Sequence, residues 1–276
     1  MKKFILPLLF IGIVFTQFTA CKGTDKKKET VMKEPRLKEE NITYSTDSLT
    51  MNGFVVYDEN VEGPRPAVIV VHEWWGLNDY AKRRARELAQ LGYIAFALDM
   101  YGNGQTAANP DEAMKLAGPF YATPSMAKGR FEAALNKLKT YTQTDSTRIG
   151  AIGYCFGGAQ VINMAKMGEP LKGVVSFHGN LNVIPVDKSL LTAEILVCHG
   201  AADPIVPQTE VDAFRHQMDS VGAKYDFKAY PGVLHAFTNP DATALGEKFK
   251  MPIKYDAAAD TASWKEMKMF FERVFK

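Results

Sequence analysis

The stretch that decides the fold runs from residue 148 to residue 158 and reads Arg148-Ile149-Gly150-Ala151-Ile152-Gly153-Tyr154-Cys155-Phe156-Gly157-Gly158. An apolar, β-type segment leads into Gly-x-Cys-x-Gly-Gly, and the helical-looking residues 159–165 follow. This order predicts a strand, a sharp turn and a helix, with Cys155 at the apex. The glycines are needed because so tight a turn strains the backbone of the apex residue and leaves no room for neighbouring side chains.

The apex position suits a nucleophile. The positive end of the following helix would lower the pKa of the Cys155 thiol and would offer free backbone N–H groups to an oxyanion. We expect the N–H of Phe156 to be the first oxyanion donor. The structural alternative is a buried cysteine in a glycine-rich turn.

On both sides of this turn, strand and helix patterns alternate. Strands are expected at residues 67–72, 93–99, 173–177, 194–198 and 225–230, and helices at 80–91, 126–141, 206–221 and 257–275. Such alternation predicts an α/β domain with a mostly parallel central sheet, helices on both faces and ligands at the carboxyl ends of the strands. Residues 101–125 are irregular apart from one short helix at 110–117, and residues 44–57 predict an N-terminal β-hairpin turning at Asn52-Gly53.

A cysteine nucleophile needs a base, and four histidines follow the turn. His216 lies within a predicted helix beside an arginine and is expected at the surface. His178 and His199 end strands, where either could be the base by position, but such residues are more often hydrogen-bonded spacers. His235 lies in the loop after the last strand, from which its side chain can reach back over the sheet. We therefore expect His235 to be the base.

The acid that orients this base is expected between the nucleophile and His235. Asp203 follows a strand end and precedes Pro204, which makes a rigid turn and fixes the direction of the carboxylate. The alternative is that Asp203 caps the helix that begins near Val206. The chain order nucleophile, acid, histidine is that of the α/β-hydrolase fold.

Four motifs in this order resemble those of the dienelactone hydrolase family of α/β-hydrolases, over about residues 44–275. They are Val71-His72-Glu73-Trp74-Trp75-Gly76-Leu77, Gly-Tyr-Cys-Phe-Gly-Gly around Cys155, His-Gly-Ala-Ala-Asp-Pro around Asp203 and Gly-Val-Leu-His-Ala-Phe around His235. The resemblance implies a hydrolase of esters or lactones that works through an acyl-enzyme.

The resemblance also implies a role for Glu73, since the equivalent glutamate of the family contacts the thiol and helps to deprotonate it when substrate binds. Glu73 leaves a buried strand beside Trp74 and Trp75, where desolvation would raise its pKa and make it a usable base. The alternative is an ion pair with an arginine of the next helix, at position 83, 84 or 86. The N–H of Trp74 is expected to be the second oxyanion donor.

One position departs from the pattern that the family name implies. Four residues after the histidine, where the enzyme that names the family has an arginine for the substrate carboxylate, this chain has Asn239. Asn cannot replace a bidentate guanidinium. We therefore expect a substrate other than dienelactone itself.

The composition excludes several classes of partner. Removing Lys2 and Lys3 from the 33 basic residues leaves 31, which equals the number of acidic residues, so nothing suggests nucleic acid as a partner. The sequence shows no metal-ligand cluster, phosphate loop or dinucleotide fingerprint, and we expect no metal and no cofactor. Cys155 and Cys198 are expected to stay unpaired, because two strand spacings of about 9–10 Å exceed the ~7 Å limit for a disulfide.

The N-terminal residues predict export. Residues 1–20 combine two lysines with an apolar segment too short to span a membrane, as in a lipoprotein-type signal peptide. Phe18-Thr19-Ala20-Cys21 resembles a lipobox, in which Cys21 would carry lipid and anchor the protein to the cell envelope, on its periplasmic or surface face. Residues 21–41 read as a flexible polar tether and residues 42–276 as one domain. The alternative is an ordinary cleaved signal peptide.

Two other functions stay open at this point. One is a non-catalytic binding or thiol-sensing lipoprotein that keeps the same turn, although a sensor would not need Asp203 and His235. The other is a peptidase-like hydrolase on the same fold. A bulky cap domain would favour the peptidase, and residues 101–125 are too short to form one.

Overall fold

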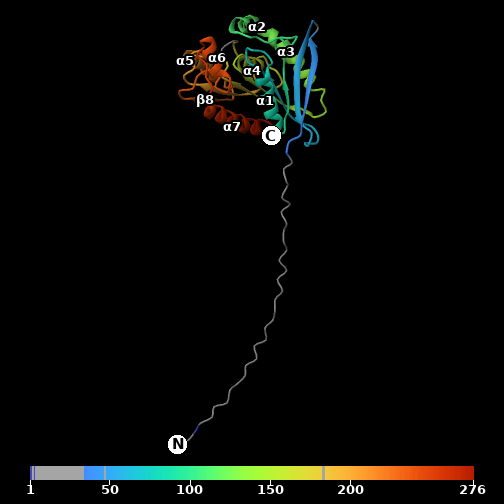
Figure 1. Cartoon of the computed structure of the whole chain (residues 1–276), viewed down its shortest axis with the longest axis vertical. Coiled ribbons are helices and arrows are strands. Elements are labelled where there is room, and N and C mark those ends of the chain that lie inside the picture. Colours follow the sequence, from blue (N-terminus) through green and yellow to red (C-terminus); the bar gives the residue numbers. More distant parts are fainter. Residues whose placement is uncertain (2, 4–33, 47, 182–183) are drawn as a thin grey trace. The chain divides into compact units, whose positions relative to one another are not determined.

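The computed structural model describes residues 1, 3, 34–46, 48–181 and 184–276, and its compact folded unit is Pro35–Lys276. An eight-stranded sheet runs through this unit in the order β1-β2-β4-β3-β5-β6-β7-β8 (Figure 1). The strands are β1 Leu37–Thr46, β2 Leu49–Asp58, β3 Arg65–Val71, β4 Ile94–Ala97, β5 Thr144–Tyr154, β6 Gly173–Phe177, β7 Glu194–Gly200 and β8 Tyr225–Tyr230. The helices are α1 Asp79–Gln90, α2 Pro110–Ala122, α3 Pro124–Leu138, α4 Phe156–Lys166, α5 Gln208–Val221, α6 Ala242–Phe249 and α7 Ala257–Val274.

The strands from β3 to β8 are parallel, and only β1 and β2 run against their neighbours. The carboxyl ends of β3, β5, β6, β7 and β8 therefore meet at one edge of the sheet. This arrangement confirms the predicted α/β-hydrolase class and places the motif-bearing loops of the sequence side by side.

Helices cover both faces of the sheet, as predicted. The apolar residues of α1 and α7 share one core with one face of the sheet, and those of α2, α3, α4 and α5 share a second core with the other face. Strands β3, β6 and β7 are buried almost throughout, and β5 is buried from Ile149 onward, which explains the continuous apolar runs in their sequences. Within the described residues, no helix combines the length and the apolarity needed to cross a bilayer.

The N-terminal hairpin is present, but the predicted turn at Asn52-Gly53 is wrong. The first strand ends at Thr46 and the second begins at Leu49, so Asn52 and Gly53 lie inside β2 and pair with Thr43 and Ile42. The glycine serves packing instead of turning, because a Cβ atom at position 53 would lie 2.3 Å from the ring of Phe96. The adjacent N–H of Asn52 donates to an Asp99 carboxylate oxygen at 3.0 Å.

Other boundaries also differ from the predictions. The tether cannot extend to residue 41, because β1 begins at Leu37; its lysine and glutamates lie on an edge strand, where charged side chains are common. The short helix predicted at residues 110–117 continues to Ala122, and α6 was not predicted. Apart from residues 1 and 3, the predicted signal peptide lies outside the described residues, as does the predicted lipidation site Cys21.

Candidate active site

The turn between β5 and α4 has the geometry that its glycines predict. Cys155 adopts φ 51° and ψ −115°, a left-handed φ that a residue with a side chain rarely accepts. A Cβ atom at Gly153 would lie 2.0 Å from the carbonyl oxygen of Gly157, and one at Gly157 would lie 2.2 Å from that of Val71. The turn therefore holds the Cys155 side chain at the start of α4, as the sequence predicts.

His235 and Asp203 meet at the same edge of the sheet. The Nδ1–H of His235 donates to Oδ2 of Asp203 at 2.7 Å, and both side chains are buried. The other carboxylate oxygen of Asp203 accepts from the N–H groups of Ile205 and Val206. The capping alternative is wrong, because α5 begins at Gln208 and has no side-chain cap. One oxygen of Asp203 holds the turn before the helix while the other orients the imidazole. His216, predicted at the surface, carries an exposed side chain on α5.

The charge of His235 depends on its two acidic neighbours. Burial lowers the pKa of the imidazole, but the negative charge of a Cys155 thiolate and the hydrogen bond to Asp203 outweigh burial and raise it to about 10. The Nε2 atom has no hydrogen-bond partner among the described residues, and His235 lines the same cavity as Cys155. The arrangement favours the protonated imidazolium form of His235.

Glu73 is buried and lines the same cavity as Cys155 and His235. Its Oε2 accepts a hydrogen bond from Nδ2 of Asn239 at 2.6 Å. Burial raises the pKa of Glu73 to about 7, although the Asn239 hydrogen bond lowers it. The alternative of an ion pair between Glu73 and the arginines of α1 is not observed. Those arginines pair with other carboxylates: Arg83 with Glu87, Arg84 with Glu87 and Asp260, and Arg86 with Glu39.

Asn239, the position where the sequence lacks a cationic anchor, contacts Glu73 and not the cavity beside Cys155. Its Oδ1 accepts from the N–H of Asp241 at 3.0 Å, which fixes the amide with Nδ2 toward Glu73. The side chain is buried and does not line the cavity beside Cys155. The sequence alone could not reveal this contact, because the two residues lie 166 positions apart.

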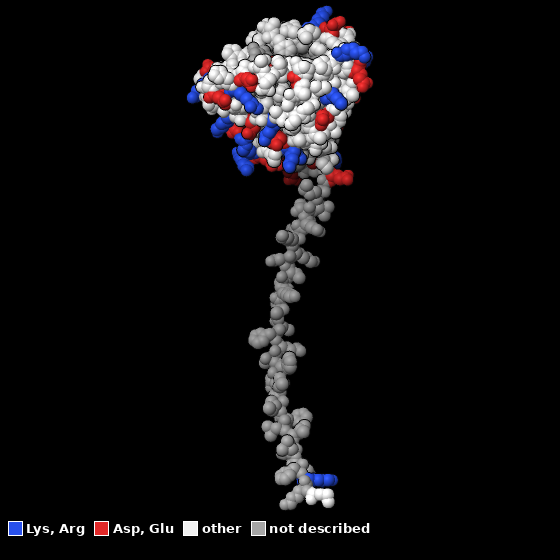
Figure 2. Space-filling view, turned by 90° about the vertical axis from the view of Figure 1, so that its left-hand side faces the viewer, with Lys and Arg blue, Asp and Glu red and all other residues white. Residues whose placement is uncertain are grey.

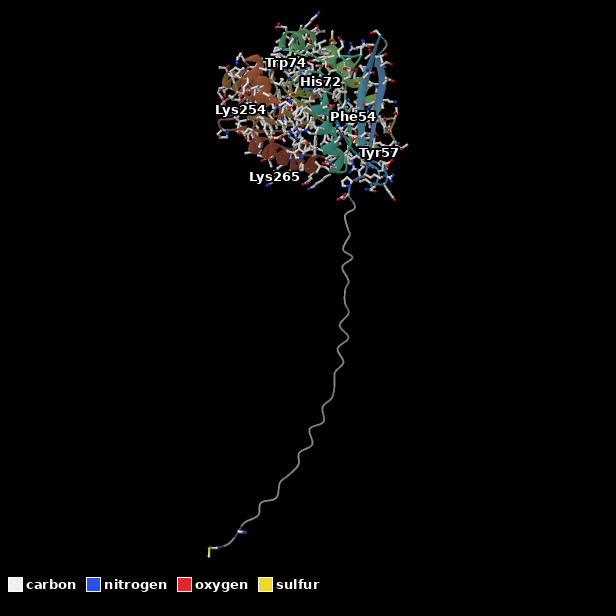
Figure 3. The ribbon with its side chains drawn as sticks, in the orientation of Figure 1. Phe54, Tyr57, His72, Trp74, Lys254 and Lys265 are labelled. Carbon is white, nitrogen blue, oxygen red and sulfur yellow. The ribbon has the colours of Figure 1, made fainter. Side chains whose placement is uncertain are left out.

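A cavity of about 220 Å³ opens beside Cys155. Glu73, Cys155 and His235 line it, together with the polar side chains of Tyr121 and Asn180 and an apolar wall made by Trp74, Trp75, Met114, Ala117, Ile205, Ala236, Met251, Pro252 and Ile253. Figure 3 labels Trp74 and His72, the two neighbours of Glu73, on the side of the domain where α2 lies in Figure 1. No lysine or arginine is among the described residues of this wall.

Of the two predicted oxyanion donors, Trp74 lines this cavity and Phe156 directly follows Cys155, which lines it. Phe156 is the first residue of α4, and Trp74 follows Glu73 in the loop after β3. Among the described residues, neither N–H donates to a protein acceptor. The hydroxyl of Tyr101 donates to the carbonyl of Trp74 at 2.9 Å, which holds the loop in place.

The sequence did not identify several residues around the site. Tyr121 on α2 lines the cavity, and its hydroxyl donates to Asn180 at 3.3 Å. Residues 251–253, which follow α6, form part of the far wall. His178 accepts a hydrogen bond from the N–H of Cys155 and is more than a spacer. His199 is buried at the end of β7 and its Nδ1 has no partner among the described residues.

Known proteins share this arrangement. The model of the dienelactone hydrolase family matches residues 51–275. A solved dienelactone hydrolase-like promiscuous phosphotriesterase from metagenomic libraries is 33% identical, with a TM-score of 0.81, over 87% of this chain and 99% of that one. A Saccharolobus solfataricus protein assigned by its name to the carboxymethylenebutenolidases is 28% identical over 86% of this chain and 100% of its own length. Protein usf of Aquifex pyrophilus is 32% identical over 63% of this chain and 77% of its own.

The family model covers most of the folded unit, from β2 to the end of α7, and includes every element that contributes to the cavity. The sequence motifs, the parallel sheet and the match to the family model agree. The chain therefore belongs to the dienelactone hydrolase family and is an ester or lactone hydrolase.

Proposed function

We propose that the protein hydrolyses uncharged esters or lactones with a Cys155–His235–Asp203 triad. One observation carries this proposal. Cys155, on its strained turn, lines the same cavity as His235, whose Nδ1 lies 2.7 Å from Oδ2 of Asp203. A binding protein would not need a buried carboxylate–imidazole pair beside a thiol. A triad needs all three.

The proposed reaction has two halves. The Cys155 thiolate attacks the carbonyl carbon, and the N–H groups of Phe156 and Trp74 bind the oxyanion that forms. Collapse of this tetrahedral intermediate breaks the C–O bond of the ester, and the imidazolium of His235 gives its proton to the leaving alkoxide. His235 then takes a proton from water, and the hydroxide attacks the thioester. Collapse breaks the C–S bond and releases the carboxylic acid and the Cys155 thiolate, to which Glu73 returns the proton that it took before the attack.

Glu73 has its proposed role before the attack. With a pKa raised to about 7 by burial, its carboxylate can accept the thiol proton near neutral pH. Its hydrogen bond to Asn239 keeps the carboxylate ordered when no substrate is bound. The protein would thus generate the thiolate when the carboxylate of Glu73 is ionised.

The cavity supports an uncharged substrate. Its wall is apolar except for the reacting groups, Tyr121 and Asn180, and no described lysine or arginine reaches it. A carboxylate would lose its hydration there without gaining a cationic partner, which is costly. Tyr121 and Asn180 offer hydrogen-bonding groups to a neutral oxygen of the substrate.

The test is hydrolysis by the purified domain of a panel containing nitrophenyl esters, neutral lactones, a phosphotriester and a peptide anilide. Cys155→Ala and His235→Ala should each lower ester hydrolysis by about 10³-fold or more, since triad members act as a unit. The phosphotriester is included because a relative carries that activity in its name. Wild-type inactivity on every ester would favour the binding protein, and selective cleavage of the anilide would favour the peptidase.

We further propose, from the sequence of residues 1–41, that the enzyme is exported and anchored by a lipid on Cys21. The supporting features are the lysines, the apolar segment and the polar tether that follows the cysteine. Mass spectrometry of the membrane fraction should find a diacylated N-terminal Cys21, and Cys21→Ser should release the protein from that fraction. An unmodified soluble chain beginning at or after residue 21 would contradict the anchor.

A further inference from the structure

His178 has more contacts with the active site than a strand-end spacer needs. It follows β6 and adopts φ 44°, a left-handed conformation that costs free energy for a residue with a side chain. The N–H of Cys155 donates both to the carbonyl of Phe177 at 3.0 Å and to Nδ1 of His178 at 3.1 Å. The ring of His178 also packs edge-on against the ring of His235, with 5.1 Å between centroids. One side chain thus touches the backbone of the nucleophile and the ring of the base.

The hydrogen bonds fix the tautomer of His178. A backbone N–H can only donate, so Nδ1 must be the acceptor and the ring proton must lie on Nε2. Nε2 therefore donates to Oγ1 of Thr238 at 2.7 Å, and the hydroxyls of Thr238 and Tyr80 share a further hydrogen bond at 2.6 Å. Burial, together with the charges of His235 and Arg84, holds the pKa of His178 well below its usual range, which keeps the ring neutral.

Thr238 connects His178 to the loop that carries the base. It lies three residues after His235 and directly before Asn239, the partner of Glu73. Its carbonyl accepts from the buried guanidinium of Arg84 at 2.7 Å, which ties this loop to α1. A displacement of His178 would therefore displace both the turn at Cys155 and the loop of residues 235–239.

We propose that His178 is a positioning residue that fixes the Cys155 turn and the loop of residues 235–239 relative to each other. Its Nδ1 holds the backbone of the nucleophile, and its Nε2 holds the base loop through Thr238. This inference rests on the proposed triad, since only then does the register of Cys155 and His235 control the rate. Neither the triad motifs nor the family pattern in the sequence assigned it.

Three substitutions separate the two contacts. In His178→Asn the amide oxygen can replace Nδ1 toward Cys155, but the shorter side chain cannot reach Thr238. Thr238→Val removes the same link from its other end, and His178→Leu removes both contacts. His199→Asn is the matched control, because it is a buried strand-end histidine without a hydrogen bond to the turn.

We expect His178→Leu to lower kcat by about 100-fold with little change in KM, as for an active-site displacement of about 1 Å. His178→Asn and Thr238→Val should each lose about 10-fold, and the double variant should lose no more than either, because both remove one link. Alkylation of Cys155 by iodoacetamide, a reaction that needs no ester, should slow in the same order. His199→Asn should stay within about threefold of wild type in both assays.

Each outcome has a distinct meaning. Losses that multiply in the double variant, or a lower melting temperature with unchanged kcat and alkylation in the folded protein, would overturn the positioning role. If Cys155→Ala retained hydrolysis, the proposed triad would fail first. If Cys155→Ala and His235→Ala were inactive while His178→Leu was fully active, only the present inference would be wrong.

Discussion

Replacing Asn239 with Leu should shift the acid limb of the enzyme's pH–rate profile to higher pH. Leucine matches asparagine in size but removes the Nδ2 donor that lies 2.6 Å from Oε2 of Glu73. Burial raises the pKa of Glu73, and this hydrogen bond partly opposes the rise, which leaves the pKa at about 7. Loss of the hydrogen bond should therefore raise the pKa above 7. The carboxylate form is the proposed base, so the acid limb of the pH–rate profile should move to higher pH.

The magnitude follows from the hydrogen bond. A hydrogen bond to a charged group contributes about 1.5–3 kcal/mol, which corresponds to a pKa change of about one to two units. At pH 7 about half of Glu73 is ionised in wild type, and about 1–10% would be ionised in the variant. The rate at pH 7 should therefore fall about 5- to 50-fold and recover as the pH approaches 9 to 10.

The assay is kcat/KM for a neutral nitrophenyl ester between pH 5 and 10. Glu73→Gln should be slower and should lack the limb near pH 7, and the Glu73→Gln, Asn239→Leu double variant should show no further shift. The double variant also controls for the lost contact between Asn239 and the N–H of Asp241. An acid limb that does not move in Asn239→Leu would refute the assignment of the limb to Glu73.

Two further predictions concern packing and specificity. Gly53→Ala should destabilise the fold by about 1–3 kcal/mol, because its Cβ would meet the ring of Phe96 at 2.3 Å; the control Gly129→Ala on α3, with nothing within 4 Å, should be neutral or slightly stabilising in urea unfolding. Of two lactones that differ only by a carboxylate, the neutral one should react with a kcat/KM about 10- to 100-fold higher, and a preference for the carboxylated lactone would show that a cation reaches the cavity.

The surface gives no contrary indication about the substrate. On the face drawn in Figure 2, acidic and basic side chains are interspersed and do not form an extended patch of one sign. The proposed preference for uncharged substrates therefore depends on the cavity wall, where desolvating a carboxylate is costly.

Local patterns in the sequence determined the elements that build the site. The Cys155 turn could be predicted because its glycines and its apolar strand are adjacent in the chain, and the φ of 51° bears out the strain that they imply. The placement of Asp203 and His235 could also be predicted, because both follow strands and parallel strands share one carboxyl edge. These inferences depend on neighbours in sequence and on the rules of parallel sheets.

Tertiary structure alone decided the contacts between distant loops. The sequence Asn52-Gly53 predicted a turn, but Gly53 is needed for close packing against Phe96. The two needs for glycine cannot be told apart from the neighbouring residues in the sequence. The sequence shows that Asn239 supplies no cationic anchor, but only the fold shows its hydrogen bond to Glu73, 166 positions away. From the sequence, His178 was expected to be a hydrogen-bonded spacer at a strand end. Its two hydrogen bonds join three loops that come together only in the folded sheet, so the sequence could not show them. Side-chain direction across such distances is set by packing, which no local pattern in the chain encodes.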